Sequence, residues 1–85
     1  MHIEATETFK KLYKKLDLKV KEQIKKSLIL LQENPNHPSL HNKKMAGQEN
    51  IYEIRVTKKY RITYSIIDNT IYLRKVGSHN ILNKP

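Results

Sequence analysis

Three arginines, one glutamate and one histidine in the second half of this 85-residue sequence could act together on an anion. Arginine is a planar fork of hydrogen-bond donors that holds a phosphate in one orientation. Histidine is the side chain best suited to give or take a proton near neutral pH. The chemistry that these residue types favour is the binding of a phosphodiester combined with proton transfer. The candidates are Glu53, Arg55, Arg61, Arg74 and His79.

The candidates lie in a stretch from residue 50 to residue 79 whose side chains alternate between apolar and polar. A two-residue period is what a β-sheet with one buried face requires. The stretch predicts three strands joined by tight turns at Lys58-Lys59 and Asp68-Asn69. One predicted face carries Tyr52, Ile54, Val56, Tyr60, Ile62, Tyr64, Ile66, Ile71 and Leu73; the other carries Glu53, Arg55, Arg61, Thr63, Ser65, Tyr72 and Arg74.

Arg55 and Arg61 should lie near each other across the first of these turns. Two like charges repel there unless an anion or Glu53 lies between them. The same spacing also fits a plain surface ion pair of Glu53 with one arginine, which would contribute little. Arg74 on the third strand favours an anion site, because three guanidinium groups on one patch need a polyanion. His79 should lie at the rim of this face, although an isolated histidine there could equally hydrogen-bond locally.

The first half of the sequence predicts two helices that cover the apolar face. After a short extended start at His2–Ala5, a possible edge strand, Thr6 and Asp17 are suitable N-caps of consecutive helices. The connection is so short that the helices should form an antiparallel hairpin. Proline ends the second helix at residues 34–36, and a loop follows to residue 48. The apolar lines are Phe9, Leu12, Tyr13 and Leu16, then Val20, Ile24, Leu28, Leu30 and Leu31.

The sequence therefore predicts a single α+β domain over residues 1–85. Its element order is β-α-α-β-β-β, with the N-terminal helical hairpin packed on one face of a mostly antiparallel sheet of three or four strands. The last residues, 78–85, are expected to be a short tail.

The formal net charge of +9 indicates a polyanionic partner such as nucleic acid, an acidic protein segment or anionic lipid, and nucleic acid is favoured over a charge that only keeps the protein soluble. Every Lys or Arg before residue 46 is lysine, whereas all three arginines lie among the predicted strands. This division suggests diffuse attraction of phosphates by one part and a defined anion site on another. A merely solvated basic face would look the same, and salt dependence separates the two. The lysines predicted to contact RNA are Lys10, Lys14, Lys25, Lys43 and Lys44, the last two bordering the arginine face.

Several other kinds of site are unlikely on composition. There is no cysteine, so neither a disulfide nor a thiolate metal site is possible. His37 and His41 have a spacing that can bind metal, but no carboxylate or cysteine accompanies them, so we expect neither metal nor cofactor. No run of residues is apolar enough for a signal peptide or a membrane span. We expect a soluble, cytoplasmic protein that does not contact a membrane.

The order of four short motifs resembles the RelE/ParE superfamily of toxin–antitoxin toxins. These are the K-x-(M/L)-x-G loop before the sheet, E-x-R on the next strand, Y-R-I-x-Y, and V-G-x-H at the close. The resemblance implies a cytoplasmic toxin neutralised by a cognate antitoxin, and in the RelE branch a ribosome-dependent endoribonuclease that cuts messenger RNA. It departs in two places: the tail has no aromatic residue to stack on a base, and Asn80 stands where many relatives have aspartate.

Carried over by motif, Arg61 matches the arginine that holds the scissile phosphate, and His79 matches a histidine that acts as general acid or base. Arg55, Glu53 and Lys43 with Lys44 match positions that line the substrate groove. The expected reaction needs no metal: the 2′-hydroxyl attacks the adjacent phosphorus, with Arg61 and Arg55 stabilising charge, His79 transferring a proton, and Glu53 as a weaker candidate base.

Two alternatives stay open. The ParE branch shares the fold but poisons DNA gyrase without cutting RNA, and a basic RNA-binding module of the same fold could lack activity altogether. For either kind of toxin, the nuclease or the gyrase poison, we expect an acidic antitoxin as partner. For the nuclease we also expect the ribosome and messenger RNA.

Overall fold

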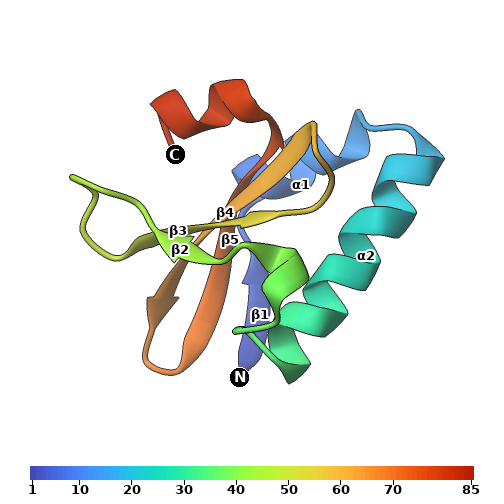
Figure 1. The fold of residues 1–85 in the computed structure, drawn as a ribbon. Helices are drawn as coiled ribbons and strands as arrows, with labels where there is room; N and C mark the ends of the chain where they lie inside the picture. The colour runs from blue at the N-terminus through green and yellow to red at the C-terminus, as the bar shows by residue number, and fades with distance from the viewer.

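Five strands form one sheet in the computed structural model, which describes all residues 1–85 (Figure 1). Their spatial order is β1-β5-β4-β3-β2. Neighbouring strands are antiparallel except β1, which runs parallel to β5. The strands are β1 (His2–Ala5), β2 (Lys43–Lys44), β3 (Ile51–Arg55), β4 (Tyr60–Ile67) and β5 (Thr70–Ser78).

Two helices, α1 (Glu7–Lys14) and α2 (Leu18–Glu33), lie together on one side of the sheet (Figure 1). Both predicted N-caps are confirmed: Phe9 N donates to Thr6 Oγ1 at 3.2 Å, and Val20 N donates to Asp17 Oδ1 at 3.0 Å. Each bond satisfies a backbone donor that the first helical turn leaves without a partner. No helix combines the length and the apolar character needed to cross a membrane.

The core lies between the helices and the apolar face of the sheet. Alternate residues of β3 and β4 contribute to it, as predicted, whereas on β5 the alternation is interrupted between Leu73 and Val76, which are both buried. The loop after α2 adds Leu40 from a short 3-10 helix, η1 (Pro38–Leu40). The fully buried apolar side chains are Ile24, Leu31, Leu40, Ile54, Ile62, Tyr64, Ile71 and Val76. The α+β architecture and the helical hairpin on one face of a mostly antiparallel sheet are confirmed.

The predicted number of strands was too low, because the loop between α2 and β3 contains a further edge strand. Lys43 pairs with Glu53, and Lys44 pairs with Tyr52. Two lysines have little intrinsic preference for strand, so the tertiary pairing with β3 decides their conformation.

The two predicted turns behave differently. Asp68 and Asn69 both have positive φ, 49° and 62°, as a two-residue hairpin turn demands. The first turn is longer than predicted, since Val56 N and Thr57 N both donate to Tyr60 O. Its consequence is a register in which Arg55 lies directly opposite Arg61.

The tail is not a simple extension. β5 continues through Ser78, and a second 3-10 helix, η2 (His79–Asn83), folds back over the polar face of the sheet. A Cβ atom at Gly77 would lie 2.8 Å from Ile81 Cγ2, so glycine is what permits this close approach. The polar side chains of Glu53, Arg61 and Thr63 are buried on this face.

Candidate active site

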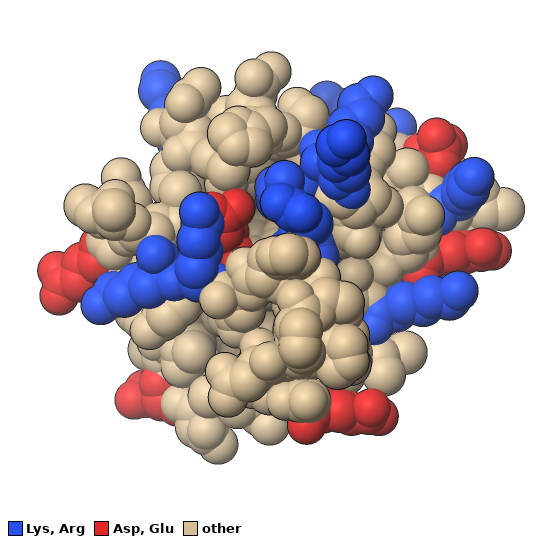
Figure 2. Space-filling view, viewed as in Figure 1, with Lys and Arg blue, Asp and Glu red and all other residues tan.

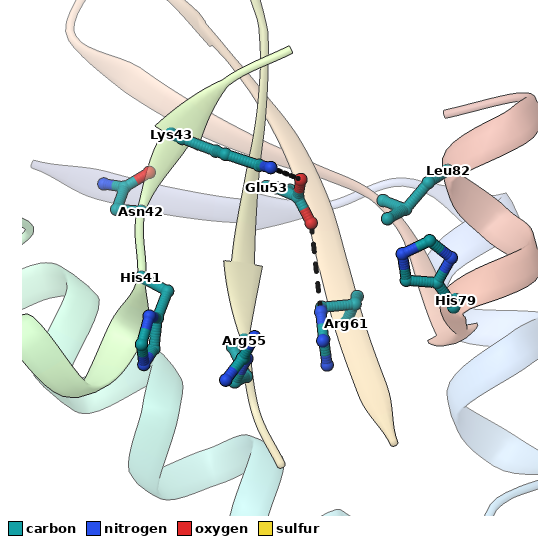
Figure 3. Close-up of a pocket in the computed structure, with 8 residues that line it drawn as sticks. All are labelled: His41, Asn42, Lys43, Glu53, Arg55, Arg61, His79 and Leu82. Atoms are coloured by element: carbon teal, nitrogen blue, oxygen red, sulfur yellow. Dashed lines mark ion pairs between the residues drawn. The ribbon is translucent and has the colours of Figure 1, made fainter. Parts of the chain in front are cut away.

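A hollow of about 560 Å³ opens on the polar face of the sheet, between the end of the loop before β2, strands β3 and β4, and helix η2 (Figure 3). Five predicted site residues line it. Three more residues complete the lining: His41, Asn42 and Leu82. The predicted ones are Lys43, Glu53, Arg55, Arg61 and His79.

The Arg61 guanidinium is fixed by the turn that precedes it. Its side chain is only 11% exposed, and Nη1 donates to the carbonyl oxygens of Thr57, Lys58 and Tyr60 at 2.8, 3.0 and 3.3 Å. These bonds use one edge of the fork and hold its orientation. A rigid cation at the edge of a hollow is suited to bind an anion without paying side-chain ordering entropy on binding.

Arg55 lies directly across the ladder from Arg61, and its Nε atom is buried with no hydrogen-bond partner. Two guanidinium groups at opposed positions repel each other. A buried donor without a partner also costs free energy, and such a group calls for a missing water or ion. Both features indicate that the hollow between the arginines is suited to receive an anion.

Glu53 balances part of this charge. Its carboxylate lies 3.3 Å from Lys43 Nζ and 3.9 Å from Arg61 Nε, and its side chain is 7% exposed (Figure 3). Strand β2 creates the first contact, because it places Lys43 opposite Glu53. The Glu53 carboxylate is thus already paired with two cations. Glu53 is therefore better suited to position Arg61 and Lys43 than to act as a general base. Three cations against one carboxylate leave the hollow positive.

Two imidazoles stand on opposite sides of the arginine pair. His79, the first residue of η2, lies on the Arg61 side, and His41 lies on the Arg55 side (Figure 3). His41 ends η1 in a left-handed conformation, with φ 47° and ψ 42°, which histidine adopts more often than most residues other than glycine. Sequence reasoning treated His41 only as half of a metal pair. Nothing in its loop sequence predicts that η1 turns it toward the hollow.

His37 has a separate role, because its Nδ1 accepts from Ser39 N at 3.2 Å at the start of η1. No group of three or more His, Cys, Asp or Glu side chains could hold a metal ion.

The segment that carries His41 and Lys43 is tied to the sheet through Asn42. Tyr64 Oη donates to Asn42 Oδ1 at 2.7 Å, and Asn42 Nδ2 donates to Pro35 O at 3.0 Å. Burial raises the pKa of the Tyr64 hydroxyl above its ordinary value, against a smaller lowering by the Asn42 hydrogen bond. The neutral hydroxyl is therefore retained as a donor, and it anchors this border of the hollow.

The expected convergence of three arginines is wrong. Arg61 pairs with Gly77, three residues beyond Arg74 along β5, and Arg74 itself has no partner on β4, because it lies at the irregularity between the partners of Thr63 and Tyr64. Arg74 instead donates from Nε to Pro85 O at 3.1 Å and from Nη1 to Ser65 Oγ at 3.4 Å. It lines a different hollow.

The lysines predicted to contact RNA do not all lie at the arginine hollow. Lys44 follows Lys43 in a strand and therefore faces the other side of the sheet, so it does not border the arginine pair. Lys10, Lys14 and Lys25 lie on the helices, with Lys10 Nζ 3.6 Å from a Glu7 carboxylate. Basic side chains are spread over the viewed surface among acidic ones and do not form one continuous patch (Figure 2).

Comparisons with known proteins agree with the fold. Residues 2–82 match the family model of the ParE toxin of type II toxin–antitoxin system, parDE. The chain belongs to this family and is a toxin of the RelE/ParE superfamily. No protein of curated function matches it by sequence.

Several solved toxins have similar structures. The isolated E. coli RelE toxin is 30% identical with a TM-score of 0.73, over 91% of this chain and 82% of that one. RelE in the intact E. coli RelBE toxin–antitoxin complex is 29% identical with a TM-score of 0.73, over 91% and 94%. A chain of the RelB–RelE complex from Methanococcus jannaschii is 26% identical with a TM-score of 0.75, over 93% of each chain.

Proposed function

We propose that this toxin is a metal-independent endoribonuclease that cuts messenger RNA on the ribosome and so arrests translation. One observation carries the proposal: two directly opposed arginines, one with a buried unpartnered donor, lie between two imidazoles in one open hollow. Similarity to RelE at 29 to 30% identity over most of the chain also supports the proposed endoribonuclease function.

The reaction needs charge stabilisation and two proton transfers. A base takes the 2′-hydroxyl proton, and the 2′ oxygen then bonds to phosphorus. The bond from phosphorus to the 5′ oxygen breaks, and an acid gives that oxygen a proton. The products are a 2′,3′-cyclic phosphate and a free 5′-hydroxyl. Arg61 and Arg55 would stabilise the charge on the phosphoryl oxygens.

His79 and His41 would transfer the two protons, one from each side of the arginine pair. Placing the acid and the base on opposite sides suits an in-line displacement, in which attacking and leaving oxygens lie on opposite sides of phosphorus. Glu53 would position Arg61 and Lys43, since its carboxylate is already paired with both.

The partners follow from charge and from the relatives. RelE was solved with its antitoxin RelB in both E. coli and Methanococcus jannaschii. We infer a cognate acidic antitoxin for this toxin, because its net charge is +9. The exposed lysines Lys10, Lys14 and Lys25 would help to seat the toxin on ribosomal RNA, in the cytoplasm where messages are translated.

The test is induced expression without an antitoxin, followed by growth and by mapping of cuts in a translated message. Arg61→Ala and His79→Ala should each restore growth and reduce cutting by about 100-fold. Lys11→Ala and His2→Ala remove a basic side chain and an imidazole from exposed positions outside the hollow and should stay toxic. Full cutting by both Arg61→Ala and His79→Ala would refute the proposed site.

The match to the ParE family model favours a second candidate, the poisoning of DNA gyrase that the resemblance implies for that branch. Inhibition of plasmid supercoiling by purified toxin, with messages left intact, would favour this candidate. A third outcome, salt-dependent RNA binding with neither effect, would indicate a non-catalytic RNA-binding module.

A further inference from the structure

A second hollow, of about 290 Å³, lies on the apolar face of the sheet, where Tyr52, Tyr64 and Ile71 line it, and shares two lining residues with the first. Asn42 and Lys43 line both hollows. The two-residue strand β2 separates them, because alternation directs Lys43 to one side and Lys44 to the other. A chain-like ligand in the first hollow would reach the second by passing round the outer edge of the sheet at β2, where Lys43 lines both hollows.

The second hollow is lined by a rigid pair of aromatic rings. Tyr52 and Tyr64 are direct neighbours across the ladder, with ring centroids 5.3 Å apart and an angle of 17° between the planes. Tyr64 is buried and its hydroxyl is bonded to Asn42, so it supports the half-buried Tyr52 from one side. The Tyr52 hydroxyl makes no hydrogen bond within the chain. Such a platform can accept a flat ring at little conformational cost.

A free cation lies beside this platform. Lys44 is paired in register with Tyr52, is exposed, and forms no ion pair, in contrast to Lys43, which contacts Glu53. An aromatic ring next to an unpaired lysine matches the two parts of a nucleotide, because the base stacks and the phosphate is attracted. An acidic protein segment would use Lys44 but has no need of an open tyrosine platform.

We propose that the second hollow is a base-binding subsite for single-stranded RNA. The strand that enters the arginine hollow passes round the edge of the sheet at β2, stacks one base on Tyr52, and places the adjoining phosphate at Lys44. This inference rests on the proposed function in that it assumes RNA in the first hollow. It gives the toxin an aromatic contact with a base even though its tail, residues 80–85, contains no aromatic residue.

The test measures binding of 2′-O-methyl oligouridylates, which cannot be cut by 2′-hydroxyl attack. A dimer can occupy the first hollow alone, whereas a hexamer can reach the second. Fluorescence anisotropy should give tighter binding of the hexamer. Tyr52→Leu should weaken the hexamer about tenfold and leave the dimer unchanged, and Tyr52→Phe should bind as wild type. Lys44→Gln, at an exposed position, should weaken only the hexamer and make its salt dependence shallower by about one unit of slope.

Unchanged hexamer binding in both Tyr52→Leu and Lys44→Gln would overturn the subsite. Equal weakening of dimer and hexamer binding would also overturn it, because it would indicate a general loss of structure. A loss of antitoxin binding with RNA binding intact would overturn it as well, because it would indicate that a protein segment occupies the second hollow. Arg61→Ala separates the two proposals. This variant should weaken the binding of both oligomers. If it changes the binding of neither while Tyr52→Leu weakens that of the hexamer, the proposed function of the first hollow is refuted and the base-binding subsite is supported.

Discussion

Arg61 and Arg74 are both arginines on the polar face of one sheet, yet their surroundings give them different tasks. Turn carbonyls hold one edge of the Arg61 fork, and the neighbouring Arg55 repels it across the ladder. Arg74 donates its Nε to Pro85 O, and Lys75 Nζ donates to Lys84 O at 2.6 Å. The first arginine lines the hollow in which we propose that RNA binds, and the second holds the tail that carries His79. Residue type and face alone do not distinguish a binding arginine from a positioning one.

The largest effect should come from exchanging arginine for lysine at these two positions. Arg61→Lys keeps the charge but loses the planar fork, so message cutting should fall about 100-fold. Arg74→Lys should keep cutting within about threefold of wild type, because a single ammonium can still donate to Pro85 O. Cutting rates of purified toxin on ribosome-bound message provide the measurement. Equal losses in the two variants would remove the distinction.

A second, smaller effect should follow from moving the tail without touching either arginine. Gly77→Ala places a methyl 2.8 Å from Ile81 Cγ2, so Ile81 must move, and we expect η2 and His79 to move with it. We expect a loss of about 1–3 kcal/mol in the free energy of unfolding, from urea denaturation, together with slower cutting. Thr70→Ala, at the other end of the same strand, is the control and should cut normally. Normal stability and cutting in Gly77→Ala would show that the tail does not position His79.

Arg74→Ala should produce a still milder change. It removes the donors to Pro85 O and Ser65 Oγ, so the free energy of unfolding should fall by about 1 kcal/mol. Hydrogen exchange of the η2 amides should accelerate while that of the strand amides stays slow. Binding of the uncleavable dimer should remain unchanged, since Arg74 does not line the arginine hollow. If Arg74→Ala bound the uncleavable dimer as weakly as Arg61→Ala does, Arg74 would have to be counted among the residues that bind RNA in the arginine hollow.

The smallest effect concerns the opposite border of the hollow, where Tyr64 anchors Asn42. The folded-state pKa of Tyr64 is raised above its ordinary value of 10.0, so the protonated form is favoured on folding. Its contribution to stability is complete below the ordinary value and is lost as the pH rises through the folded-state pKa. Unfolding experiments from pH 8 to pH 11 should show this loss in wild type and a smaller one in Tyr64→Phe. Identical pH profiles would contradict the assignment.

Much of the fold could be predicted because its signals are local. Thr6 and Asp17 are caps that act on donors three residues away, and Asp68-Asn69 tolerates positive φ by its own chemistry. The alternation in β3 and β4 placed Glu53, Arg55 and Arg61 on the correct face, so the centre of the candidate site could also be predicted.

The rest depended on long-range geometry. Arg74 lies at the irregularity opposite Thr63 and Tyr64 and has no partner on β4, and no residue type near it predicts that irregularity. Pairing with β3 makes a strand of Lys43 and Lys44, and their side chains therefore face opposite sides of the sheet. The contribution of His41 depends on the path of the loop after α2. These features arise when distant segments meet, and period and propensity do not encode them.

Strand β2 has one more consequence, for solubility. The outer edge of a sheet presents unpaired amide and carbonyl groups on which a second molecule can add a strand, the first step toward fibrous aggregates. Here that edge is two residues long, and both are lysine. It offers little backbone to pair with, and its charge repels another copy. The toxin can therefore leave a hollow open at the margin of its sheet while protecting that margin against polymerisation.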